Sequence, residues 1–374
     1  MLTDRSDMTR AYDTTYYFQK MQEYGFGTVK DLSNLPTGSF IMLPLCWLEP
    51  VTAKVIWNIL GIIFLSFAVI LLFRSFDISH KSTTGLILIL LVLLFYPFYY
   101  NIAYGQAYAL LLLLASFSVY GFKKNNTLLI ALPLAMIIIL KGYGFYPLTA
   151  LLLVKKPKAF LLTLGIAIVM IFLTFPIFGL SAWQMYYIKF YSVVAYGDLS
   201  STTANQTVGS LLGHLFSYDP IANTNAVLSI PRVYIYYIMQ IGGLAVLYIT
   251  SRKFASQNYL LFFVLSFALN VIFSPAAEDY HSLLYLPLIV LAGSGLFKNI
   301  NFTSPHFYIF TLAVLLLMLP LPFRQLQDFS FPLYILAYPR LYGAGLLCIV
   351  VFIYGQQKLP SFLTAPAVLK EGKR

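Results

Sequence analysis

The fold is decided by unbroken apolar stretches such as ILGIIFLSFAVILLF, which runs from Ile59 to Phe73. Comparable runs occur at Leu86–Phe95 and Leu312–Pro320. Apolar residues in these runs do not alternate with polar ones, as they would in the strands of a membrane barrel. Within lipid, every backbone N–H and C=O group needs a partner inside the protein, and an α-helix supplies it. The stretches therefore predict transmembrane helices.

The composition agrees with this interpretation. The 374 residues are 60% hydrophobic and 10% charged, whereas a soluble globular domain has about 25% charged residues. A helix that crosses a bilayer needs about 20 apolar residues. We predict spans at 52–73, 84–98, 105–121, 127–140, 144–154, 159–177, 232–250, 258–274, 282–297, 306–321 and 336–354. The chain is thus predicted to be an all-α polytopic membrane protein with a bundle of about eleven transmembrane helices.

The loops between these spans differ in charge on the two sides of the membrane. If the N-terminus lies outside, the cytoplasmic segments contain most of the basic residues, namely Arg74, Lys81, Lys123, Lys124, Lys155, Lys156, Lys158, Arg252, Lys253, Lys298, Lys358, Lys370, Lys373 and Arg374. Cytoplasmic loops of membrane proteins have such an excess of lysine and arginine. This orientation explains the net charge of +11 without a nucleic-acid partner, and it places the C-terminus in the cytoplasm.

Several function classes find no support in the sequence. It contains no Walker A loop, no HExxH, no GxSxG and no GxGxxG after a strand, so no cofactor is predicted. Paired acids in an Asp-x-Asp arrangement are absent too, and no metal site is predicted. Cys46 and Cys348 lie far apart without metal-ligand spacing, which indicates packing residues. The segment Met1–Asp31 has no apolar core, so no signal peptide is predicted.

The predicted outer side holds almost everything that does not resemble a span. We divide the chain into an outer-face segment at 1–51 and a transmembrane bundle at 52–374, which includes a long outer loop at 178–231. Loops of this length are usually functional or disordered. Aromatic residues in the loop favour order and a helix lying on the membrane surface. Short outer loops are predicted at 99–104, 141–143, 275–281 and 322–335.

Polar residues gather on the same predicted side. Asp7, with Asp4 and Asp13 nearby, is either a general base or a solvated terminal charge. Gln106 opens a span after a glycine, where it either meets a ligand at a helix N-terminus or caps the helix. Lys141 lies on a short outer turn, and it is either an anion contact or an anchor that reaches towards the interface.

Two further groups lie later in the chain. Asn205 and Gln206 in the long loop are either ligand-facing amides or part of a helix cap. His281 begins a late span from the outer side, and Tyr280 separates it from the acids Glu278 and Asp279. It is either a hydrogen-bonded structural residue or a catalytic one. The two carboxylates would tend to raise the pKa of His281, and a cationic imidazole there would suit a phosphate.

The order of these groups along the chain resembles a known pattern. Its elements are Ser6-Asp7, Pro36-Thr-Gly-Ser-Phe40, Leu43-Pro44-Leu45, Gly105-Gln106 opening a span, Leu140-Lys141 ending another, Asn205-Gln206-Thr207 in a long outer loop, and Ser274-Pro275 followed by His281. This order resembles that of the bacterial polyprenyl-phosphate-mannose-dependent mannosyltransferases, glycosyltransferase family 87, with the membrane-embedded GT-C architecture. The resemblance runs from about residue 6 to about residue 295.

The resemblance implies a transferase that moves a hexose, first of all mannose, from a polyprenyl-phosphate donor to a glycolipid or glycan acceptor, with inversion and without a metal or cofactor. It implies a multi-pass protein of the bacterial inner membrane with an extracytoplasmic active site. Asp7 matches the position of the general base, and His281 is the second catalytic candidate. Residues implied in binding the donor phosphate or substrate are Lys141, Gln106, Asn205, Gln206, Arg10 and Tyr12, with Arg324 as a further cation.

The sequence departs from the family in one respect that matters for the fold. The family has a spanning helix before its catalytic aspartate, and none precedes Asp7, so this helix either lies upstream of Met1 or is missing. Two other functions compete with the transferase. A transporter or flippase should show internal repeats and paired charges within spans, but Arg340 has no acidic partner nearby in sequence. A membrane scaffold would tolerate the loss of Asp7 and His281.

Overall fold

The computed structural model describes residues 10, 12–23, 35–196, 203–217, 226–254, 258–297, 304–326 and 332–354. Within these ranges the chain forms helices and turns, with an isolated bridge between Ser217 and Ser229 and no β-strand. The prediction of an all-α protein is therefore confirmed for the described part of the chain.

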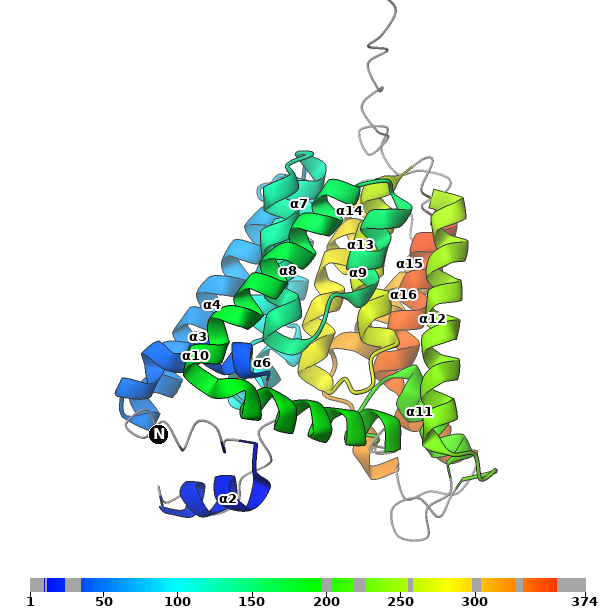
Figure 1. Ribbon diagram of the computed structural model, residues 1–374. Coiled ribbons are helices and arrows are strands. Elements are labelled where there is room, and N and C mark those ends of the chain that lie inside the picture. Colours follow the sequence, from blue (N-terminus) through cyan, green and yellow to red (C-terminus); the bar gives the residue numbers. More distant parts are fainter. Residues whose placement is uncertain are drawn as a thin grey trace, which may run out of the picture.

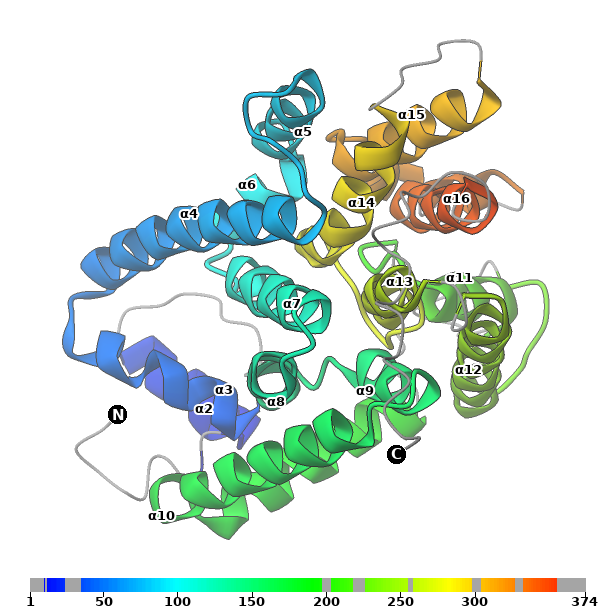
Figure 2. The ribbon, with the colours of Figure 1, turned by 90° about the horizontal axis from the view of Figure 1, so that it is seen from above.

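Most helices stand side by side in an upright bundle (Figures 1 and 2). They are α4 (Pro50–Ser75), α5 (Thr83–Leu93), α7 (Tyr108–Lys123), α8 (Thr127–Lys141), α9 (Phe145–Leu153), the first part of α10 (Pro157–Tyr196), α12 (Arg232–Phe254), α13 (Tyr259–Ile272), α14 (Leu286–Leu296), α15 (Pro305–Met318) and α16 (Pro339–Tyr354). Every residue of α13 from Leu260 to Ile272 is buried. Because α13 is apolar on all sides, other helices must surround it, and it forms the centre of the core.

Within the described ranges, four stretches are long and apolar enough to cross a membrane by length and composition. They are Pro50–Ser75, Thr83–Ala103, Pro157–Ile188 and Arg232–Phe254. Shorter apolar helices of 10–17 residues accompany them at Tyr108–Lys123, Thr127–Lys141, Tyr259–Ile272, Pro305–Met318 and Pro339–Ile353. All eleven predicted segments are helical, whereas their number as full membrane crossings stays a prediction.

The predicted outer loop at 99–104 is wrong for most of its length. Helix α6 (Tyr96–Ala103) fills it and is separated from α5 by a break at Leu94 and Phe95. Pro97 stands in the first turn of α6, where the missing N–H of proline costs no helical hydrogen bond. The proline thus starts a new helix instead of letting α5 continue through the predicted span.

The long segment 178–231 contains helices, as its aromatic content indicated. Helix α10 bends at Gly179, whose φ of 71° and ψ of 162° are accessible almost exclusively to glycine. The part of α10 beyond this bend crosses the lower end of the bundle in Figure 1. Helix α11 (Val208–Phe216) follows at the same end. The location of a helix of this segment on the membrane surface stays a prediction from the sequence.

The lower end of the bundle in Figure 1 therefore holds additional short helices. It gathers α2 (Thr14–Glu23), α3 (Pro36–Met42), α6 and α11. The threonine Thr37 on α3 donates a hydrogen bond to the carbonyl of Ile139 near the end of α8. A short 3-10 helix, η1 (Leu43–Trp47), then leads to α4. The boundary predicted at residue 51 thus falls within the first turn of α4.

Candidate active site

A short buried 3-10 helix, η2, connects α13 to α14 at the lower end of the bundle. It spans Asp279–Tyr285, and all seven of its residues are buried. Pro275 follows the end of α13, and Pro287 stands in the first turn of α14. These prolines limit the two helices and leave a tight segment between them. The charged or titratable side chains Asp279 and His281 consequently lie inside the protein.

His281 lies in a cluster of tyrosines. Its Nε2 atom is 2.5 Å from the hydroxyl oxygen of Tyr108 at the start of α7. The ring of Tyr280 stacks on the imidazole with a centroid distance of 4.8 Å, and the ring of Tyr143 lies 5.5 Å away. His281 is 8% exposed, and its Nδ1 atom forms no hydrogen bond within the described residues. Because a buried polar atom is costly when it stays unpaired, this nitrogen is a candidate contact for a ligand.

The expected rise in the pKa of His281 is not found. Burial lowers the pKa of His281 well below its usual value, and the positive charge of Lys141 lowers it further. A hydrogen-bond interaction with the backbone of Glu278 raises the pKa of His281, but by less than burial and Lys141 lower it. His281 is therefore neutral near pH 7. The cation close enough to act on the His281 imidazole is Lys141.

This protonation state predicts how stability depends on pH. The folded protein keeps His281 neutral, whereas the unfolded chain binds a proton below about pH 6.5. The stability that neutral His281 contributes is thus complete above that pH and is lost as the pH falls below it. The melting temperature of the purified protein should fall between about pH 7 and pH 5, and it should fall less in His281→Gln. His214, whose pKa burial also lowers, leaves part of the effect in place. An equal fall in both proteins would contradict the assignment.

Lys141 reaches this cluster from α8. It is the last residue of α8, and Gly142 caps the helix in the left-handed conformation at φ 68°. The ammonium nitrogen of Lys141 lies 5.8 Å from the centre of the Tyr108 ring. The turn after α8 also binds the loop after α13, because the hydroxyl of Tyr143 donates to the carbonyl of Ala276 at 2.9 Å. The structure thus brings together Lys141 and His281, which lie far apart in the sequence.

A second polar group lies on the same η2 segment. The carboxylate of Asp279 accepts a hydrogen bond of 2.9 Å from Nε of Arg340, and a guanidinium nitrogen of Arg324 lies 3.7 Å from its other oxygen. Asp279 and Arg340 are almost fully buried. They border a cavity of about 220 Å³ whose wall also includes Tyr96 and Tyr100. Three charged groups therefore meet at a cavity beside the His281 cluster.

The sequence did not reveal this second group. Asp279 and Arg340 are separated by 61 positions, so the absence of a nearby acid said nothing about the partner of Arg340. Tyr108 was missed as well, because a tyrosine at the start of an apolar helix carries no distinctive signal. A buried arginine in an apolar segment nevertheless requires a partner, and this rule was the available hint.

The side chain of Gln206, in the long loop, stabilises the backbone next to the Asp279–Arg340 pair. The side chain of Gln206 donates to the carbonyls of Thr203 and Ala337 and accepts from the backbone N–H of Arg340 at 3.1 Å. Asn205 is also buried. Gln206 thus holds the start of α16 in place. Its predicted contact with substrate stays a prediction.

Gln106 is half-buried at the start of α7, two residues before Tyr108. Its backbone N–H donates to the carbonyl of Asn101, and the side chain of Asn101 accepts from the N–H of Tyr108 at 2.9 Å. The side chain of Asn101 therefore satisfies the first backbone N–H of α7. Gln106 is not needed for that role, which leaves its predicted contact with a ligand open.

The N-terminal candidates divide into described and undescribed residues. Asp7, the predicted base, lies outside the described residues. Tyr12 is 3% exposed and packs against Phe178 on α10, which indicates a packing role. Arg10 pairs with Asp13 at 3.1 Å, and Asp13 caps α2 by accepting from the N–H of Tyr16.

Fold and site together define an all-helical membrane protein with a polar, tyrosine-lined site buried at one end of its bundle. The family model described as glycosyltransferase family 87 matches residues 35–277. The chain therefore belongs to glycosyltransferase family 87 and is a membrane glycosyltransferase. The matched range includes Gln106, Lys141, Asn205 and Gln206, and it ends just before Asp279 and His281. No curated protein and no solved structure matches the chain.

Proposed function

We propose that this glycosyltransferase takes a hexose, with mannose as the first candidate, from a polyprenyl-phosphate donor. The acceptor is a glycolipid or a glycan, and transfer takes place on the non-cytoplasmic face of a bacterial inner membrane. One observation carries the proposal within the family: Lys141 and the unpaired Nδ1 of His281 lie in one buried cluster at the end of the bundle. An ammonium in the same cluster as an imidazole suits a phosphate that must be bound and released as an anion.

The reaction divides among these residues as follows. The acceptor hydroxyl oxygen attacks the anomeric carbon, and its proton passes to a carboxylate, for which Asp7 is the candidate. The bond between that carbon and the phosphate oxygen breaks, and the electron pair leaves with the phosphate. Lys141 stabilises the negative charge that develops there. Direct attack inverts the anomeric centre and needs neither a covalent intermediate nor a metal.

His281 acts on the phosphate as a neutral group. When the hydroxyl of Tyr108 donates to Nε2 of His281, the ring proton resides on Nδ1, and Nδ1–H then donates to a phosphate oxygen. Arg324 is the further candidate cation, since it lies 3.7 Å from Asp279 and lines the cavity that Asp279 and Arg340 border.

Transfer from a radiolabelled polyprenyl-phosphate sugar tests the proposal. We expect Lys141→Met to lower kcat about tenfold to a hundredfold, because it removes a charge that stabilises the leaving phosphate. His281→Gln should lower it about tenfold. Lys158→Met is the matched control, since Lys158 is exposed and begins α10 at the other end of the bundle. Unchanged transfer in Lys141→Met and His281→Gln would overturn the site. A wild-type protein that transfers only from nucleotide sugars would overturn the donor.

A further inference from the structure

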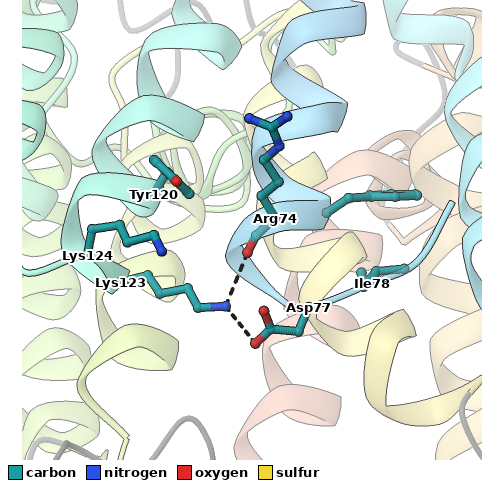
Figure 3. Close-up of a pocket in the computed structure, with 7 residues that line it drawn as sticks. Arg74, Asp77, Ile78, Tyr120, Lys123 and Lys124 are labelled. Carbon is teal, nitrogen blue, oxygen red and sulfur yellow. Dashed lines mark hydrogen bonds and ion pairs between the residues drawn. The ribbon is translucent and has the colours of Figure 1, made fainter.

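A second cavity lies at the end of the bundle opposite the candidate active site. Its volume is about 460 Å³. It is lined by Phe73, Arg74, Asp77, Ile78, Tyr120, Lys123 and Lys124. Figure 3 shows that these residues come from the ends of α4 and α7 and from the turn after α4. Phe73 and Ile78 pack in or against the core, and the proposed transfer reaction uses none of the lining residues.

The charges around this cavity are not balanced. Lys123 already has partners within the protein. Its ammonium lies 2.6 Å from a carboxylate oxygen of Asp77 and donates to the carbonyl of Arg74 at 3.1 Å (Figure 3). Arg74 and Lys124 are exposed and form no ion pair within the described ranges. Three basic residues and one carboxylate thus line the cavity, and the guanidinium of Arg74 points away from Asp77 (Figure 3). Cations at the ends of α4 and α7 are favoured by the helix dipoles, but two of these three still have no anionic partner.

The surface next to the cavity is apolar and follows one side of α4. Ile63, Phe67 and Ile70 are 41%, 55% and 46% exposed. They precede Arg74 by eleven, seven and four residues, a spacing that places all four on the same side of the helix. The stripe therefore leads along α4 directly to the guanidinium of Arg74. An acyl chain fits the stripe, and a charged headgroup fits its end.

We propose that this cavity binds the phosphodiester headgroup of an anionic membrane lipid. Arg74 and Lys124 hold the phosphate oxygens, since a guanidinium can donate two parallel hydrogen bonds to a phosphate. Basic pockets between transmembrane helices bind anionic headgroups in this way. The apolar stripe favours a lipid over free inorganic phosphate, which has no acyl chain to place there.

Native mass spectrometry of the purified full chain tests this site, with titrated phosphatidylglycerol and phosphatidylcholine as probes. We expect the wild-type chain to bind phosphatidylglycerol more tightly than phosphatidylcholine. Arg74→Gln and Lys124→Gln should each weaken phosphatidylglycerol binding about fivefold, and the double variant about 25-fold. Asp77→Asn should strengthen it, because it frees Lys123. Lys158→Gln is the matched control and should change nothing.

A competition measurement distinguishes a lipid ligand from free phosphate. Inorganic phosphate at millimolar concentration should displace little phosphatidylglycerol. Equal affinity for the two lipids, or equal loss in Lys158→Gln and Arg74→Gln, would overturn the site. Displacement of phosphatidylglycerol by inorganic phosphate at a concentration as low as that of the lipid would overturn the assignment of a lipid ligand and leave a phosphate site. Retained glycosyl transfer in Arg74→Gln would show that its loss of lipid does not come from misfolding.

Discussion

Replacing Asp7 with asparagine should lower glycosyl transfer about a hundredfold to ten-thousandfold at unchanged expression. The acceptor hydroxyl must lose its proton as it attacks, and a positioned general base contributes this factor. Asparagine keeps the size of the side chain but cannot take up a proton near neutral pH. The measurement is kcat with a labelled polyprenyl-phosphate sugar and a saturating extract of acceptors.

The structure supplies a sharp control for this experiment. Asp13 caps α2 through a hydrogen bond of 3.1 Å from Tyr16, and asparagine caps a helix as well as aspartate does. Asp13→Asn should therefore keep both its folding and its activity. If Asp7→Asn stays active and Asp4→Asn loses activity, the base is Asp4. A loss in Asp13→Asn alone would move the base to Asp13.

The second large effect concerns stability. Asp279→Asn should lower the free energy of unfolding by about 3–5 kcal/mol, because it leaves the buried charge of Arg340 without a carboxylate. Arg324 would add a second cation at the same place. Denaturant unfolding of the protein in detergent, followed by its near-ultraviolet spectrum, measures this loss.

Two further variants should destabilise the protein less than Asp279→Asn does, if the ion pairs of Asp279 determine the stability. Arg340→Met should destabilise less than Asp279→Asn, because Asp279 keeps Arg324 at 3.7 Å. Arg324→Gln should cost less than about 1 kcal/mol, since this arginine is 44% exposed and its pair is screened by water. Equal stability of Asp279→Asn and Arg324→Gln would show that the buried pair does not hold η2 in place.

The two η2 side chains connect stability with function. Asp279 and His281 are two residues apart, and Arg340 binds the first while Tyr108 binds the second. Loss of the arginine pair should therefore disturb the histidine cluster too. Activity assays on Asp279 variants need a folding check for this reason.

Much of the helical architecture followed from the sequence, because apolar runs in a chain with few charges have few other stable conformations in lipid. The break before α6 could also have been predicted from the sequence, because Pro97 marks it. The bend at Gly179 lies two residues beyond the predicted end of the span at 177. The sequence did not mark Gly179 itself as the turning point, because a glycine in an apolar run looks the same whether or not the helix turns there.

The candidate site divides in the same way. The sequence by itself determined which polar residues stand at the ends of apolar segments, and so it selected Lys141 and His281. Only the tertiary structure decided what surrounds them: Tyr108 lies 173 positions from His281, and Arg340 lies 61 positions from Asp279. The pKa of His281 followed from those surroundings, and burial with Lys141 reversed the direction expected from the adjacent acids. Local sequence sets which groups are present, whereas desolvation and the distances between charges exist only once the helices have packed.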